Sequence, residues 1–188
     1  MNDVKAIVEA LIFASDTPLG LEKIVEHLKD RGGAKEDIVQ VLADLKAEYD
    51  ERQGGFALQE VAGGYQFRTR ADLSPWIKRL RGDKAALLSP AALETLAVVA
   101  YRQPVVKIEI DAARGVDAGG VLKGLLDRKL IRIVGRKDVP GKPMLYGTTK
   151  KFLEVFNLND ISELPTLREL KDLQKSAGYE QLSLLNDE

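Results

Sequence analysis

The stretch IRIVGRKDVPGKPMLYGTT, residues 131–149, comes nearest to a known chemistry. Gly135 and the later pair Gly141 and Lys142 echo the Walker A loop, GxxxxGK[ST], which cradles phosphates. The spacing is wrong, because five residues separate the glycines instead of four. Pro143 also stands where a hydroxyl should bind magnesium, and a strand-like run follows where a helix N-terminus is needed. We therefore do not expect this loop to bind a nucleotide.

The rest of the sequence supplies little material for catalysis. Cysteine is absent and His27 is the only histidine, so disulfides, cysteine nucleophiles, triads and His-rich metal sites are not expected. Glu109 and Asp111, at positions i and i+2, do not share a helical face and form no pair for acid–base work. We predict that the protein is not an enzyme, and that it has no metal site and no cofactor.

The basic loop can instead contact nucleic acid. The formal net charge is only −1, but eight basic residues and one acid, Asp138, lie between Arg128 and Lys151. Basic side chains on a hairpin loop can contact backbone phosphates, and the candidates for DNA or phosphate contact are Arg136, Lys137 and Lys142. A solvated turn, whose charges keep the edge strands soluble, is the alternative. The sequence leaves both open.

Composition is that of a globular protein, with 45% hydrophobic and 30% charged residues in a chain of 188. The apolar start VKAIVEALIFA is interrupted by Lys5 and Glu9, and it is too short to span a bilayer. We therefore expect a cytoplasmic protein with no membrane partner.

The helices and strands that must position these residues are predicted to occur in the same order twice along the chain. Hydrophobic spacing predicts helices, and two period-2 runs joined by Gly63 and Gly64 predict a hairpin. After a basic helix that contains Trp76, helices and the strands of the basic loop follow again. The expected helices cover 4–12, 21–28, 38–49, 89–102, 104–114 and 117–126, and the expected strands cover 56–62, 65–70, 131–134 and 144–148.

Helices followed by a hairpin are the order of a winged-helix domain. We predict an α+β fold, mainly α with small β-hairpins, made of tandem winged-helix domains plus a C-terminal helical appendage. The predicted boundaries are an N-terminal domain at 1–81, a linker at 82–88, a C-terminal domain at 89–157, and an appendage or flexible tail at 158–188. We interpret Trp76 as an anchor that packs the basic helix on the first domain.

The third helix of the second domain is a poor reader of DNA bases. When its apolar stripe faces inward, the outermost residues are Gly120, Lys123, Gly124 and Asp127. Glycine offers no side chain to a base edge, and aspartate repels phosphate. We do not expect sequence-specific recognition, although the basic loop remains able to contact the DNA backbone.

Two helices carry more apolar surface than one small core needs. From Ala91 to Tyr101 the only charged residue is Glu94, so this helix is buried on more than one side, against the rest of the chain or against a partner segment. The first helix has a similar excess, which predicts a twofold dimer unless intrachain packing covers it. The candidate dimer residues are Ile7, Ala10, Leu11, Phe13 and Ala14.

Several long motifs resemble one family. LSPAALETLAVVAYRQPVVKIEI, RGVD and GVLKGLLDRKLIRIVGRKDVPGKPMLYGTTKKFLEVFNL are similar to bacterial segregation and condensation protein B. The resemblance covers essentially the whole chain and is densest over 88–158. It implies two winged-helix domains and a homodimer formed mainly by the N-terminal ones. It also implies binding of the kleisin, segregation and condensation protein A.

The same resemblance implies a role beside the nucleoid. The kleisin joins the structural maintenance of chromosomes (SMC) ATPase in a condensin-like complex for chromosome condensation and segregation during cell division, and the ATPase activity resides in that partner. We expect the kleisin at or beside Leu96, Val99, Tyr101, Arg102 and Pro104. The alternative function is that of a winged-helix DNA-binding protein or transcriptional regulator that contacts DNA through its basic wing.

Overall fold

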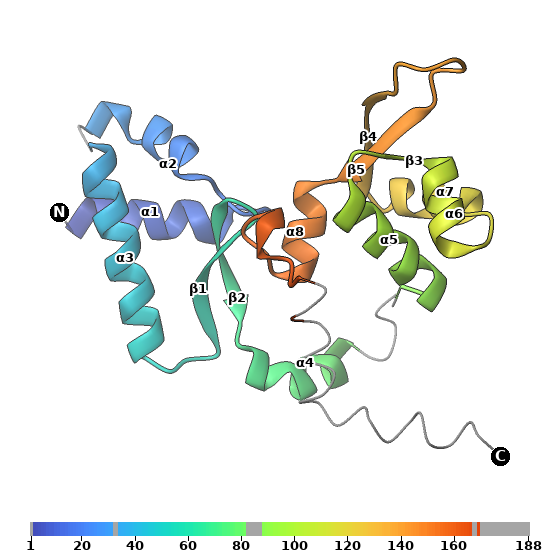
Figure 1. The fold of residues 1–188 in the computed structure, drawn as a ribbon. Helices are drawn as coiled ribbons and strands as arrows, with labels where there is room; N and C mark the ends of the chain where they lie inside the picture. Colours follow the sequence, from blue (N-terminus) through green and yellow to red (C-terminus); the bar gives the residue numbers. More distant parts are fainter. Residues whose placement is uncertain (1, 32–33, 82–87, 167–168, 170–188) are drawn as a thin grey trace.

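Two units lie side by side in the computed structural model, which describes residues 2–31, 34–81, 88–166 and 169 (Figure 1). The predicted linker falls outside the described residues except for Leu88. The predicted appendage is described as far as Thr166, and beyond it only at Glu169.

The first unit consists of helices and a two-stranded antiparallel hairpin. Its elements are α1 (Asn2–Ala14), α2 (Leu21–His27), η1 (Lys29–Arg31), α3 (Lys35–Glu51), β1 (Phe56–Val61), β2 (Gly64–Thr69), η2 (Ala71–Leu73) and α4 (Ser74–Arg81). The hairpin turns at Ala62 and Gly63, whose φ angles of 53° and 72° are the left-handed values that a two-residue turn between twisted strands needs. The predicted hairpin is confirmed, with its turn one residue earlier than expected.

A close approach at Gly64 fastens the loop between α1 and α2 to this hairpin. A Cβ at Gly64 would lie 2.8 Å from the carbonyl carbon of Leu19, so glycine is needed there. Next to it, Leu19 and Tyr65 exchange two backbone hydrogen bonds of 2.9 Å. The loop therefore takes the place of a third strand beside β2.

The second unit repeats the order and adds a short strand. Its elements are α5 (Pro90–Arg102), β3 (Val105–Val106), α6 (Lys107–Arg114), α7 (Gly119–Asp127), β4 (Ile131–Arg136), β5 (Met144–Thr148), α8 (Lys150–Phe156) and η3 (Ile161–Glu163). The antiparallel sheet has the strand order β3-β5-β4. Ser89 caps α5 as predicted, because its hydroxyl accepts a hydrogen bond from the backbone N–H of Ala92 at 3.2 Å.

Two boundaries in this unit differ from the sequence expectation. The helix expected from residue 104 begins at Lys107, because Val105 and Val106 pair with β5 instead. The cap expected at Asp117 lies one residue further on, at Ala118. The backbone N–H of Ala118 donates to the carboxylate of Asp111 at 2.8 Å, which ties the start of α7 to α6. The α+β class and the repeated order are confirmed.

Each unit has its own hydrophobic core. The first core joins α1, α2, α3 and β1, and its buried members are Val8, Ile12, Ile24, Leu28, Ile38, Leu42, Leu45 and Leu58. The second joins α5, α6, α7 and α8 with β3 and β4, and its buried members include Leu96, Val99, Ile110, Leu122, Leu125, Ile131 and Phe152. Among the described residues, the two clusters of buried side chains have no member in common.

This second core corrects part of the predicted kleisin site. Leu96 and Val99 are 1% and 0% exposed, because α5 turns them toward α6 and α7. A folded second unit therefore offers neither side chain to a partner. Their apolar character serves the core of the unit.

The interpretation of Trp76 is wrong. Its side chain is 61% exposed, and α4 packs chiefly against η2, the short turn before it. Figure 1 shows α4 beyond the end of the hairpin and away from α1 and α2. Trp76 therefore does not anchor α4 on the first unit.

Leu96→Ala should destabilise the second unit by about 2–5 kcal/mol, because the truncation leaves a cavity in a packed core. The matched control is Leu93→Ala on the same helix, where the side chain is 45% exposed, and its free energy of unfolding should change by no more than about 0.5 kcal/mol. Urea unfolding followed by circular dichroism measures both variants. Equal losses of stability would contradict this packing of α5.

Candidate protein-interaction surfaces

An exposed apolar surface follows α1 where the dimer was predicted. Ala10, Phe13 and Ala14 are exposed, and Phe13 leaves 74% of its surface in solvent. Ile7 and Leu11 are half-buried, and Ile7 packs against the first core. The predicted dimer residues are therefore partly exposed and partly buried, and Phe13 is the largest exposed side chain among them.

An aromatic cavity of about 310 Å³ opens beside this surface. We call it the aromatic cavity; it is lined by Ala6, Glu9, Ala10, Phe13, Tyr49, Phe56 and Phe67. The rings of Tyr49 and Phe67 lie 4.8 Å apart between centroids, and those of Phe56 and Phe67 lie 5.7 Å apart, edge to face. This cavity could not be predicted from the sequence, because its lining comes from α1, α3, β1 and β2, which only the fold brings together.

One polar contact fixes the wall of the cavity. The hydroxyl of Tyr49 donates a hydrogen bond to the carboxylate of Glu9. This hydrogen bond, aided by partial burial, raises the pKa of Tyr49 to about 12. It also links α3 to α1 within the lining of the cavity.

The exposed part of the predicted kleisin site lies where α5 ends. Tyr101, Arg102 and Pro104 are exposed. Ile108 on the first turn of α6 adds a large exposed apolar side chain that was not among the predicted site residues. The hydroxyl of Tyr101 donates to the carbonyl oxygen of Pro165 at 2.7 Å. Here the chain after α8 lies against α5.

That C-terminal segment also covers the second core. Leu158, Ile161 and Leu164 pack against its buried side chains. Packing against the rest of the chain was one of the two explanations for the apolar surface of α5, and the C-terminal segment provides part of it over the described residues. The apolar side chains of α5 are thus divided between the core, this segment and solvent.

The basic wing is partly held by the fold. The ammonium of Lys137 pairs with the carboxylate of Glu109 at 2.6 Å, and this contact lowers the pKa of Glu109. The guanidinium of Arg136 donates to the carbonyl oxygen of Lys142 at 3.2 Å. The wing also exposes apolar side chains, namely Ile133, Val134, Val139 and Met144. Its surface is therefore mixed and not uniformly cationic.

The outward face of α7 has the predicted composition. Gly120, Lys123, Gly124 and Asp127 are all exposed, and open space surrounds both glycines. This face offers one cationic side chain and one carboxylate. It therefore presents little that could read a base edge.

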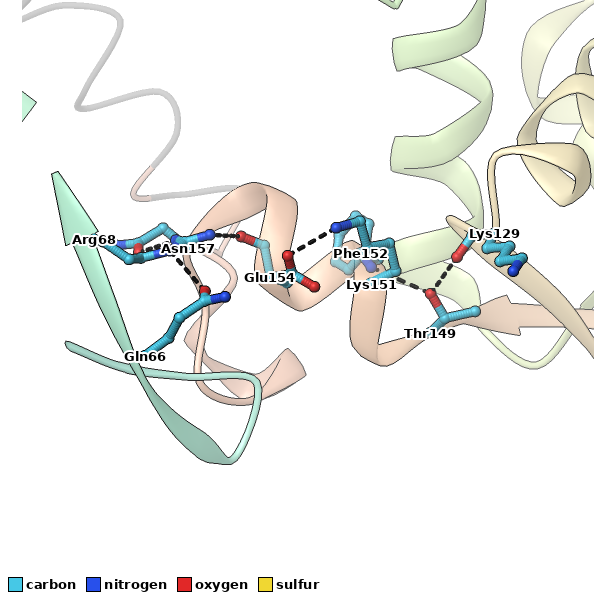
Figure 2. Close-up of polar contacts among 8 residues, drawn as sticks. All are labelled: Gln66, Arg68, Lys129, Thr149, Lys151, Phe152, Glu154 and Asn157. Carbon is cyan, nitrogen blue, oxygen red and sulfur yellow. Dashed lines mark hydrogen bonds and ion pairs between the residues drawn. The ribbon is translucent and has the colours of Figure 1, made fainter. Parts of the chain in front are cut away.

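The joint between the two units centres on Arg68 of β2 (Figure 2). Its guanidinium donates to the side-chain oxygen of Asn157 and to the backbone carbonyl oxygen of Glu154, both at 2.8 Å. Gln66 accepts from the Nε of Arg68 at 3.2 Å. One planar group with several donors therefore binds the C-terminal end of α8.

The hairpin turn makes a second set of contacts across the joint. The backbone N–H of Ala62 donates to the carbonyl oxygen of Leu158 at 2.8 Å, and the N–H of Gly63 donates to the side-chain oxygen of Asn159 at 2.8 Å. The amide of Asn159 donates to the carboxylate of Glu60 at 3.2 Å. The hairpin tip of the first unit is thus occupied by the second unit.

The N-terminal end of α8 is fixed to the rest of the second unit (Figure 2). The hydroxyl of Thr149 accepts a hydrogen bond from the N–H of Phe152 at 3.2 Å and donates to the carbonyl oxygen of Lys129 at 2.6 Å. Because α8 is capped at one end and bound by Arg68 at the other, it connects the two units. The joint was not foreseen from the sequence.

Sites of other kinds are not found among the described residues. No group of three or more His, Cys, Asp or Glu side chains there could hold a metal ion. No helix in that part of the chain is long and apolar enough to cross a membrane.

Comparison with known proteins identifies the family. Residues 6–167 match the family model of the segregation and condensation complex subunit ScpB. The chain belongs to the ScpB family.

Relatives agree over most of the chain. The segregation and condensation protein B of Syntrophotalea carbinolica is 49% identical over 93% of this chain and 87% of the relative. The segregation and condensation protein B homolog of Coxiella burnetii is 45% identical over 96% of this chain and 88% of the relative. The crystal structure of ScpB from Mycobacterium tuberculosis is 34% identical, covers 84% of this chain and 96% of that chain, and has a TM-score of 0.40.

Arg68→Ala should loosen the joint without unfolding either unit. The backbone N–H of Ala62 should exchange with solvent about tenfold to a hundredfold faster, because charged hydrogen bonds that hold its acceptor segment are lost. Arg70→Ala is the control, because Arg70 bonds to Asp72 and Gln53 within the first unit. Hydrogen exchange measured by NMR distinguishes them. The same exchange rate at Ala62 in both variants would show that Arg68 does not hold the joint.

Alkaline pH should weaken the first unit through Tyr49. Its pKa is raised from an ordinary 10.0 to about 12 in the folded protein, so the stabilisation is fully present below pH 10 and is lost as pH rises through 12. Tyr49→Phe cannot ionise and should lack this part of the pH dependence. Urea unfolding from pH 9 to 12 compares the two proteins, and parallel curves would contradict the assignment.

Proposed function

We propose that the protein is a non-enzymatic subunit of a bacterial condensin-like SMC complex. It acts as a homodimer in chromosome condensation and segregation during cell division, in the cytoplasm at the nucleoid. It binds the kleisin, segregation and condensation protein A, and reaches the SMC ATPase through the kleisin. The match to the family of segregation and condensation complex subunits over residues 6–167 carries the proposal.

The surface of α1 supports the homodimer. Phe13 is an aromatic side chain left mostly in solvent, and Ala10 and Ala14 beside it allow another helix to approach closely. A twofold axis would bring the same patch of each protomer together, which is the commonest interface in homodimers. Large exposed aromatic side chains are enriched in such interfaces.

The second unit supports a kleisin-binding role at the end of α5. Tyr101, Arg102 and Pro104 remain in the proposed site, with Ile108 beside them in the sequence. Aromatic, arginine and apolar side chains together are the usual anchors of a protein interface. Leu96 and Val99 have no part in the site, because they belong to the core.

The DNA-binding alternative has weaker support. Lys137 is paired with Glu109, and the wing and α7 expose apolar or small residues instead of a continuous basic surface. Arg136, Lys137 and Lys142 could still contact phosphates without sequence preference. Such contact would weaken steeply with added salt.

Light scattering of the full-length protein tests the proposal. Alone, it should have twice the 20.7 kDa mass of one chain, and adding the kleisin of the same genome should increase that mass further. Phe13→Asp should shift the protein toward the monomer, because it places charge in the contact. Val155→Asp is the control, since Val155 is an exposed apolar residue on α8 and should leave the dimer intact.

A second experiment tests the binding of the kleisin. Arg102→Glu should weaken kleisin binding at least about tenfold by calorimetry, while Arg132→Glu, on the exposed strand β4, should not. A mass of 20.7 kDa that does not change when the kleisin is added would refute the proposal. In that case a salt-dependent gel shift with duplex DNA would decide whether the wing binds DNA.

A further inference from the structure

Helix α4 presents apolar side chains that its own unit does not cover. Trp76 and Leu80 are 61% and 84% exposed, and their i, i+4 spacing puts them on one face of the helix. An ordered helix that leaves a tryptophan and a leucine in solvent is typical of an interaction surface. The helix is also strongly basic, because it has Lys78, Arg79 and Arg81 and no acidic residue.

The aromatic cavity has the complementary shape. It is open to solvent, and its walls are the rings of Phe13, Tyr49, Phe56 and Phe67. Its volume of about 310 Å³ leaves room for an aromatic side chain. An inserted ring would meet edges and faces of several others, the arrangement that aromatic clusters favour. Trp76 is not part of the lining, so the cavity and the tryptophan are separate features of one chain.

The charges around the cavity are complementary to α4. Glu9 lies in the lining, and the last turns of α3 expose Glu48, Asp50 and Glu51 beside Tyr49. Lys5 is held by Glu48, and Arg52 lies 6.0 Å above the ring of Tyr49. The carbonyl end of α3 adds negative potential to these carboxylates. A cationic helix is therefore attracted to this side of the first unit.

The position of the cavity favours a second copy of this chain as the source of that helix. Ala10 and Phe13 belong both to the cavity lining and to the proposed dimer surface of α1. A protomer bound to α1 therefore borders the cavity. Two α4 helices would repel each other, whereas α4 against the acidic end of α3 is a favourable pair. A twofold axis would form this contact twice.

We propose that in the homodimer α4 of each protomer reaches across and inserts Trp76 into the aromatic cavity of its partner. Leu80 covers the rim, and Lys78 and Arg79 face the acidic end of the partner's α3. This inference rests on the homodimer of the proposed function and adds to it the segment that is exchanged. It gives α4 a role in the dimer that packing within one chain does not supply.

Fluorescence reports this contact directly, because Trp76 is the sole tryptophan of the chain. Emission and acrylamide quenching are measured on the full-length protein over a dilution series, with light scattering on the same samples. As the dimer forms, the emission should shift to the blue and quenching should fall. A dimer whose Trp76 stays exposed overturns the insertion and leaves the homodimer standing. A monomer at every concentration overturns both.

Other occupants of the surface give different results. Trp76 protected equally in monomer and dimer would mean that the chain covers α4 itself, and protection only after adding duplex DNA would assign the helix to nucleic acid. Either result overturns the proposal.

A variant pair tests the energetics. Trp76→Ser should weaken dimerisation at least about tenfold, since truncating a buried aromatic anchor usually costs that much affinity. Because Trp76 is exposed in the single chain, the variant should keep its fold by circular dichroism. Val116→Ser, at an exposed apolar position of the second unit, is the control and should dimerise normally. Equal dimer affinities in the two variants would refute the insertion.

Discussion

The guanidinium group of Arg68 holds together two units that have separate cores. It binds the end of α8 through two hydrogen bonds of 2.8 Å, and the hairpin turn adds backbone and Asn159 contacts beside it. Hydrogen bonds are directional, so a few of them can fix the orientation of one unit relative to the other. The direction in which each unit presents its exposed surfaces depends on this joint.

The joint also decides what the first hairpin can do. The turn at Ala62 and Gly63 is bonded to Leu158 and Asn159, so its backbone N–H groups are not available to a ligand. The hairpin of the second unit stays accessible, yet Lys137 pairs with Glu109 and apolar side chains lie beside it. The hairpin of the first unit thus packs against the second unit, whereas the hairpin of the second unit exposes a surface of mixed apolar and basic side chains.

Small cores explain why so much apolar surface remains outside. A unit of this size buries a modest fraction of its surface, so helices with apolar residues on several sides must find other partners. The C-terminal segment provides one such partner, because Leu158, Ile161 and Leu164 pack against the second core and Pro165 accepts a hydrogen bond from Tyr101 of α5. On α1 and α4, Phe13, Trp76 and Leu80 have no comparable cover among the described residues. Burial of these side chains against another chain would therefore remove the most apolar surface from water.

The sequence by itself determined the local elements and the family. Hydrophobic spacing placed most of the helices but gave none at α8, Gly63 marked the hairpin, and the long motifs between 88 and 158 indicated the relatives. It missed β3, because two residues are too few to show a period, and only pairing with β5 makes them a strand.

Tertiary structure alone decided which apolar side chains are inside. Leu96 and Trp76 have similar apolar character in sequence, but α6 and α7 cover the first while nothing comparable covers the second among the described residues. It alone formed the aromatic cavity and the joint, where Arg68 meets Asn157 across 89 positions of the chain. Local pattern predicts which residues form a helix or strand, whereas burial depends on which distant segments the fold brings against it.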